Sequence, residues 1–106
     1  MKPNKHKNKD IIDHIAIVVK DIDSSLSFYT KQFGCDILYS DSTCAILQFE
    51  NIKLSLVSKN QHPAHIAIIN DAIINDKNAI KHRDNSISKY IKDYDGNYIE
   101  LITYKK

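Results

Sequence analysis

The stretches DHIAIVV (residues 13–19) and AHIAIIN (residues 64–70) are near copies of each other, and in each a histidine precedes Ile-Ala-Ile. Both stretches are rich in β-branched residues and contain neither Gly nor Pro. This composition is typical of β-strands. The repeat therefore predicts two equivalent strands, each of which opens one half of the fold.

The residues that follow the first copy predict a helix and three strands. Residues 21–34 have apolar side chains at helical spacing, with Asp23 or Ser24 as the helix cap and Gly34 as a left-handed stop. Short polar turns separate the strand-like runs that come next. These runs are residues 35–40, 43–49 and 52–58.

The second half repeats this plan in shorter form. Residues 71–84 predict a weaker helix, with two isoleucines one heptad apart. Two strands at 85–93 and 97–104 then flank Asp95-Gly96, a strong hairpin signal. The two halves are therefore predicted as β-α-β-β-β and β-α-β-β, with one strand missing from the second.

Size and composition predict a single globular domain. The chain has 106 residues, of which 42% are hydrophobic and 26% charged. It contains no apolar run of membrane-spanning length and no signal-peptide pattern, so we expect a soluble cytoplasmic protein. We expect one domain over residues 11–106, with a first module at about 11–58 and a second module at about 64–104.

The net charge of +2 does not indicate a nucleic-acid-binding face. Residues 1–10 carry four lysines and one aspartate, so the rest of the chain sums to −1. A basic face on the folded part would be needed to hold phosphates, and the sequence offers none. Residues 1–10 are expected to form a flexible basic tail. Cys35 and Cys44 are expected to be reduced and to act as small strand hydrophobes.

The repeated histidines and one glutamate fall on comparable faces of three strands. Side chains alternate across a strand, so His14 shares a face with Ala16, and His65 shares one with Ala67. If helices cover the Ile-rich faces, Glu100 in the last strand points to the same side as the histidines. Two imidazoles and one carboxylate then form the 2-His-1-carboxylate set, which binds a divalent metal and leaves coordination positions open.

The same residues also have a purely structural interpretation. A single histidine in a strand is more often a packed residue than a ligand, and a glutamate in a terminal strand usually faces solvent. The joint placement of all three at equivalent positions of the repeat favours the metal site. The other histidines do not share this placement. We expect surface positions for His62 and His82, while His6 belongs to the basic tail.

Two longer stretches resemble the vicinal oxygen chelate superfamily, which includes glyoxalase I, extradiol dioxygenases, methylmalonyl-CoA epimerase and the bleomycin- and fosfomycin-resistance proteins. IDHIAIVVKDIDSSLSFYTKQFG (residues 12–34) is similar to the opening strand and helix of that family. YIKDYDGNYIELI (residues 90–102) is similar to its closing hairpin, with Tyr94 where the family usually has proline. The resemblance extends over about residues 11–104. It implies an α+β fold of paired βαβββ modules forming a cupped mixed sheet, here with a shortened second module.

The resemblance also implies functional residues. It places metal ligands at His14, His65 and Glu100, and hence one divalent ion, which could be Fe, Mn, Ni, Co or Zn. Glyoxalase I-like members have a fourth ligand, Glu or Gln, where this chain has Ser55, so the departure favours a three-ligand site. The expected cavity-lining residues are Ser55, Tyr98 and Ile102.

Two functions remain open at this point. The first is a small metal-dependent enzyme that acts on a small molecule with vicinal oxygens, either dioxygenase-like or glyoxalase/lyase-like. The second is a non-catalytic small-molecule or antibiotic-binding module of the bleomycin-resistance type, because no residue can be assigned as the catalytic acid or base. Members of the family commonly dimerise, so the resemblance implies a homodimer. The expected partner is a small molecule, with neither nucleic acid nor membrane involved.

Overall fold

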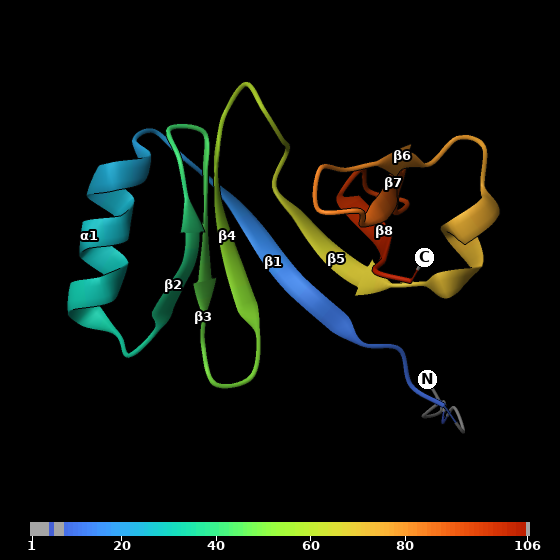
Figure 1. Ribbon diagram of the computed structural model, residues 1–106, viewed down its shortest axis with the longest axis horizontal. Coiled ribbons are helices and arrows are strands. Elements are labelled where there is room, and N and C mark those ends of the chain that lie inside the picture. The colour runs from blue at the N-terminus through green and yellow to red at the C-terminus, as the bar shows by residue number, and fades with distance from the viewer. Residues whose placement is uncertain (1–4, 6–7, 106) are drawn as a thin grey trace.

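The computed structural model describes residues 5 and 8–105, so most of the expected basic tail lies outside the described residues. Within them, eight strands form one curled sheet in the order β2-β3-β4-β1-β5-β8-β7-β6 (Figure 1). The predicted α+β fold with a cupped mixed sheet is confirmed. No helix in the described part of the chain is long and apolar enough to cross a membrane. The strands are β1 (Ile12–Val19), β2 (Asp36–Ser40), β3 (Cys44–Gln48), β4 (Lys53–Ser58), β5 (His65–Ile69), β6 (Ile80–Lys81), β7 (Ile87–Lys92) and β8 (Tyr98–Thr103).

The sequence repeat is also a repeat of the sheet topology. β1 and β5 lie side by side at the centre of the sheet and run antiparallel. Each of them pairs in parallel with the last strand of its own half, β1 with β4 and β5 with β8. The order β1-β4-β3-β2 on one side therefore matches β5-β8-β7-β6 on the other. This arrangement places the two histidine-bearing strands next to each other.

The hydrophobic core determines which way β1 faces. Helix α1 (Ile22–Gln32) packs on one face of the first half of the sheet. Leu47 and Leu56, both fully buried, form the centre of this core, and Ile17 of β1 packs against them. Because neighbouring residues of a strand alternate between faces, His14 lies on the opposite side of the sheet.

Both ends of α1 differ from the prediction. Asp21, and neither Asp23 nor Ser24, is the N-cap, and its carboxylate accepts a hydrogen bond of 2.8 Å from the backbone N–H of Ser24. The helix ends at Phe33 in an extended conformation with φ −135°. Gly34 does not take positive φ. The expected left-handed stop was wrong because the chain leaves the helix directly towards β2.

The helix predicted at residues 71–84 was wrong. A 3₁₀-helix, η1 (Asp71–Asn75), occupies only its start. The side chain of Asp76 then accepts a hydrogen bond of 2.8 Å from the backbone N–H of Asn78, and the edge strand β6 (Ile80–Lys81) follows. Short polar side chains that bind their own backbone compete with helix formation in this way. The strand predicted to be missing is present, but it has only two residues.

The short second half leaves apolar surface uncovered. Ile15, Ile66, Ile99 and Ile91 form a continuous row across β1, β5, β8 and β7. Of these, Ile15, Ile66 and Ile91 are 38%, 43% and 41% exposed. We call these four residues the isoleucine row. By strand alternation it lies on the face of the sheet opposite to His14.

Candidate metal centre

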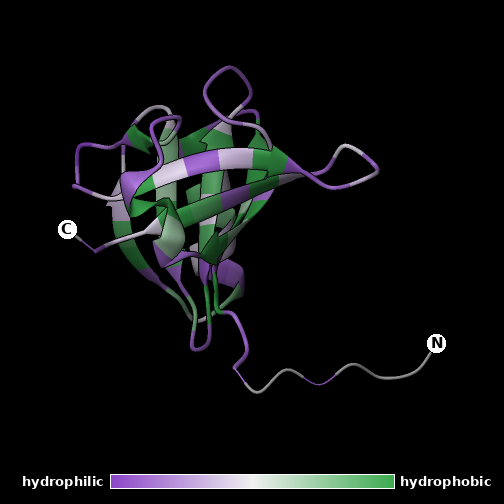
Figure 2. Ribbon diagram, turned by 90° about the vertical axis from the view of Figure 1, so that its right-hand side faces the viewer, coloured by the Kyte–Doolittle hydropathy of each residue, from purple (hydrophilic) through white to green (hydrophobic). Residues whose placement is uncertain are grey.

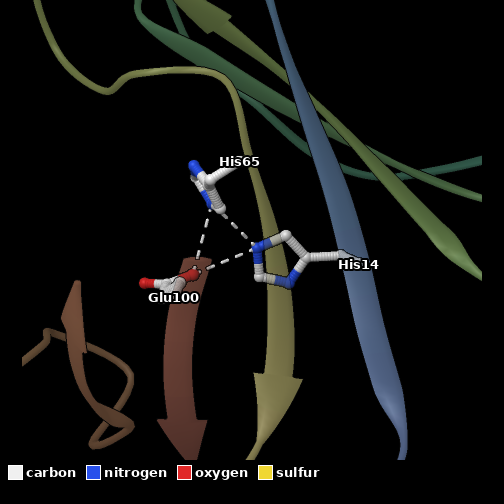
Figure 3. A group of neighbouring side chains, drawn as sticks. All are labelled: His14, His65 and Glu100. Atoms are coloured by element: carbon white, nitrogen blue, oxygen red, sulfur yellow. Dashed lines mark hydrogen bonds and ion pairs between the residues drawn. The ribbon is translucent and has the colours of Figure 1, made fainter. Parts of the chain in front are cut away.

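Three side chains from three adjacent strands meet on the inner face of the sheet. His14 comes from β1, His65 from β5 and Glu100 from β8 (Figure 3). The Nε2 atoms of the two histidines are 3.4 Å apart, and they lie 3.2 and 3.3 Å from Oε1 of Glu100. The three side chains are only 13%, 5% and 9% exposed. The structure thus brings together all three residues that the repeat singled out.

The strand register explains this convergence. Ala67 of β5 is paired with His14 on one side and with Glu100 on the other. Ala16 of β1 is paired in the same way with His65. Both alanines are buried, at 2% exposure or less. Because a methyl group is the largest side chain between the three polar groups, the space at their centre stays free.

Both histidines are oriented by a hydrogen bond through Nδ1. His65 donates to the backbone carbonyl of Pro63 at 2.8 Å, and His14 donates to the carboxylate of Asp13 at 2.7 Å. A donor at Nδ1 leaves Nε2 as the acceptor atom of a neutral imidazole. In both rings this Nε2 atom is the one that faces the centre of the cluster.

Asp13 reaches His14 because β1 is irregular at that point. The pairing of β1 with β5 shifts register between Ile12 and His14, which is a β-bulge. Bulges redirect side chains near functional sites. The carboxylate of Asp13 also accepts a hydrogen bond of 2.7 Å from the hydroxyl of Tyr104 and lies 3.3 Å from Nζ of Lys53. Strand alternation alone would put Asp13 on the other face, so the sequence pattern did not indicate this contact.

Charge coupling within the cluster is strong. Burial lowers the pKa of His14, but hydrogen bonds and charges from Asp13 and Glu100 outweigh it and raise that pKa to about 9. Burial raises the pKa of Asp13, yet its bonds to His14 and Tyr104 lower it to about 2. The pKa of Glu100 is lowered as well, because the bonds from His14 and His65 overcome the effect of burial. Glu100 and Asp13 are therefore anions at neutral pH.

The dimensions of the cluster fit a divalent cation. A tetrahedral ion with ligand bonds of about 2.0–2.1 Å holds its donor atoms about 3.3 Å apart. The three separations of 3.2, 3.3 and 3.4 Å match this value. Two imidazole nitrogens and one carboxylate oxygen are also donors that suit Zn, Fe, Mn, Co and Ni.

An open cavity of about 670 Å³ lies over the cluster. Ser55 and Ile102, two of the three expected cavity residues, are among its lining residues. Tyr98 is not among its lining residues; instead it packs edge-on against Tyr90, with ring centroids 5.8 Å apart. Polar loops surround the sheet, and hydrophobic residues run along its strands (Figure 2). The volume is in the range of small-molecule sites, about 300–1,000 Å³.

Four of the five histidines of the chain line this cavity. His62 and His82, expected at the surface, are among them, and His82 is only half-exposed. Nε2 of His82 lies 2.6 Å from Oγ of Ser88 on β7. The turn between β6 and β7, and not the end of a helix, carries His82. The tyrosines that line the cavity are Tyr39, Tyr90 and Tyr104.

Ser55 is the structural equivalent of Glu100. Ser55 is paired with Ala16 across β4 and β1, just as Glu100 is paired with Ala67 across β8 and β5. Ser55 is buried at 7% exposure, and its neutral hydroxyl is a poor ligand for a divalent ion. The cluster therefore offers three candidate ligands, and Ser55 adds no fourth.

A family model identifies the family of this chain. The model described as Glyoxalase/Bleomycin resistance protein/Dioxygenase superfamily matches residues 11–68, which is more than half of the chain. The chain belongs to this superfamily. The resemblance to vicinal oxygen chelate proteins is thus confirmed. Among curated proteins, no sequence matches significantly.

Solved structures of low sequence identity share the fold. A hypothetical protein from Bacillus halodurans C-125 is 16% identical, with a TM-score of 0.72 over 93% of this chain and 97% of that one. Methylmalonyl-CoA epimerase from Mycobacterium tuberculosis is 19% identical, with a TM-score of 0.69 over 86% and 85%. A superfamily member from Vibrio splendidus 12B01 is 10% identical, with a TM-score of 0.64 over 89% and 98%. The TM-scores show that the fold is shared, and at identities of 10–19% the comparison shows nothing beyond the fold.

Proposed function

We propose that this protein is a metal-dependent enzyme that acts on a small molecule with two adjacent oxygen atoms. His14, His65 and Glu100 hold one divalent ion, which is Fe, Mn, Ni, Co or Zn. One observation carries the proposal: three donor atoms from three strands lie 3.2 to 3.4 Å apart, at the spacing of a metal ligand set. The large cavity beside them supplies room for a substrate.

The proposed chemistry follows from a three-ligand site. A divalent ion held there supplies Lewis acidity, which polarises oxygen atoms of the substrate and stabilises charge that develops on them. The protein ligands approach from the sheet side, so the remaining positions face the cavity. Pro63 and Asp13 keep the two imidazoles in the ligand orientation, and Val57 and Ile102 add apolar surface to the wall of the cavity.

A second function is supported by Ser55. Because Ser55 replaces the fourth ligand position, the chain offers no carboxylate there for proton transfer. A non-catalytic binding module of the bleomycin-resistance type needs no such group. A similar solved structure, 22% identical, is methylmalonyl-CoA epimerase in complex with methylmalonyl-CoA and NH4+. That complex supports the binding of a small molecule by this fold without deciding between enzyme and binder.

Binding of a neutral chelating probe tests the two functions against each other. We expect 4-methylcatechol, which offers two adjacent oxygens, to bind the Zn²⁺-loaded protein and not the chelator-treated protein, as measured by calorimetric titration. Binding that is equally strong without Zn²⁺ would favour the non-catalytic module. Zn²⁺ suits this test because it has no redox chemistry with catechols.

The affinity for metal is expected to rise with pH. In the metal-free protein the pKa of His14 is about 9, and a metal ligand must be a neutral imidazole. Below that pH the ion has to displace the proton of His14, so the apparent affinity falls about tenfold for each pH unit below about 9 and levels off above it. Calorimetric titration over this range, in buffers of different ionisation enthalpy, measures both the affinity and the proton released. An affinity that does not change with pH would contradict the assignment of His14.

Asp13→Asn tests the cause of this pH dependence, because it removes a negative charge that raises the pKa of His14. Without the negative charge the pKa of His14 falls, so the plateau begins at a lower pH. The limiting affinity is also expected to fall about 10- to 100-fold, because the carboxylate no longer orients the ring and raises its basicity. If the two curves coincide, Asp13 has no such role.

Homodimer formation stays a prediction. The isoleucine row gives it physical support, since a contiguous apolar strip on a sheet face is what a self-complementary dimer buries. Sedimentation of the purified chain measures this directly.

A further inference from the structure

The chain contains a single arginine among its fifteen basic residues, and that arginine lines the cavity. Arg83 lies in the turn between β6 and β7, together with His82 and Asp84. Arginine has a planar fork of N–H donors that binds a carboxylate through two parallel hydrogen bonds, which lysine cannot do. Among the side chains that line this cavity, Arg83 is therefore the one whose donor geometry matches a carboxylate.

Arg83 has no acidic partner within the described part of the chain. The carboxylate of its neighbour Asp84 accepts hydrogen bonds of 2.9 and 2.6 Å through Oδ1, from the backbone N–H and the hydroxyl of Ser86, and forms no ion pair with Arg83. None of the ion pairs among residues 8–105 includes Arg83. The guanidinium is exposed to solvent and free to bind an anion that enters the cavity.

The turn that carries Arg83 is held in place by its own hydrogen bonds. The backbone N–H of His82 donates to the carbonyl of Ser86 at 2.7 Å, and that of Asn85 donates back to His82 at 3.0 Å. Asn85 takes φ 71°, the left-handed conformation that asparagine tolerates. A fixed turn presents Arg83 to the cavity at low entropic cost.

Among the described residues that line the cavity, Arg83 is the basic side chain outside any ion pair, and the carboxylate of Asp84 beside it also lines the cavity. Lys53 also lines the cavity, but its Nζ lies 3.3 Å from the carboxylate of Asp13. The carboxylate of Glu100 is paired with both His14 and His65. With a divalent ion in place the centre carries a net positive charge, so both it and Arg83 attract anions.

We propose that Arg83 binds a carboxylate of the substrate while the adjacent oxygens of the same molecule reach the metal centre. The substrate class is thus a small acid that carries a vicinal oxygen pair. A carboxylate fits better than a phosphate, because the wall offers one guanidinium fork without a helix N-terminus or a second unpaired cation. This inference rests on the proposed function, since the chelating end needs the metal.

Matched catechols test this inference with the Zn²⁺-loaded protein. 4-Methylcatechol carries the oxygen pair without a charge, whereas 3,4-dihydroxybenzoate, 3,4-dihydroxyphenylacetate and 3,4-dihydroxyphenylpropionate add a carboxylate on progressively longer arms. We expect at least one acid to bind about tenfold more tightly than 4-methylcatechol, which corresponds to about 1.4 kcal/mol. In Arg83→Gln this preference is expected to disappear, while the affinities for Zn²⁺ and for 4-methylcatechol stay the same.

Lys81→Gln is the matched control. It removes the same charge two residues away, on an exposed side chain of β6 that does not line this cavity. It is expected to keep the full preference for the acid. If no acid binds more tightly than 4-methylcatechol, or if the preference survives in Arg83→Gln, the inference is overturned and the proposed function stands. If neither Zn²⁺ nor any catechol binds the wild-type chain, the proposed function fails together with the inference.

Discussion

Replacing His65 by alanine is expected to abolish stoichiometric binding of a divalent ion. The His65 side chain is only 5% exposed, and a hydrogen bond of 2.8 Å to Pro63 fixes its ring. Its removal leaves one histidine and one carboxylate, and neither can move to close the gap because both come from other strands. We expect the affinity to fall by more than about a thousandfold, which is more than about 4 kcal/mol.

His62→Ala is the matched control for this replacement. His62 lines the same cavity and precedes His65 by three residues, but it is exposed and is not part of the ligand cluster. Calorimetric titration with Zn²⁺ should give one ion per chain for His62→Ala and none for His65→Ala. Equal affinities in the two variants would rule out His65 as a ligand.

Replacing Ala67 by leucine is expected to remove metal binding without touching a ligand. Ala67 is fully buried and is paired with both His14 and Glu100, so its methyl group lies between them. A leucine there would place its branched end in the space that the ion needs. Overpacking of this kind also lowers stability by about 1–3 kcal/mol.

Ala45→Leu separates these two effects. Ala45 is an equally buried strand alanine, but it belongs to the core beneath α1 on the other face of the sheet. We expect this variant to lose stability by a comparable amount, measured by urea unfolding, and its folded fraction to bind Zn²⁺ like the wild type. If Ala67→Leu also binds Zn²⁺ normally, the space between His14 and Glu100 is not the metal position.

Much of the fold and of the cluster could be predicted because both depend on strand periodicity. The repeat of His14 and His65 identified equivalent strands, and side-chain alternation placed the three candidate ligands on one face. The alanines two positions after each histidine indicated free space, and the register now shows that Ala67 lies between two of the three groups. These features follow from a period of two residues, which the sequence displays directly.

The errors concern local geometry that periodicity does not encode. The helix predicted at residues 71–84 failed because side chains such as Asp76 bind nearby backbone groups instead. That failure misplaced His82, which a hairpin carries into the cavity. Asp13 was missed because a β-bulge reverses its face. Tyr98 packs against Tyr90, its diagonal neighbour across β8 and β7, and the pattern within one strand does not reveal such a pair.

The most direct test of the metal centre is thermal unfolding of the chain without a histidine tag, first treated with chelator and then titrated with Zn²⁺. Binding of one ion to the folded state alone stabilises it by about 4 kcal/mol when free Zn²⁺ is a thousand times Kd. For a domain of this size the melting temperature should then rise by more than about 10 °C, and chelator should reverse the rise. A melting temperature that neither Zn²⁺, Co²⁺, Ni²⁺, Mn²⁺ and Fe²⁺ nor chelator changes would contradict a metal site at His14, His65 and Glu100.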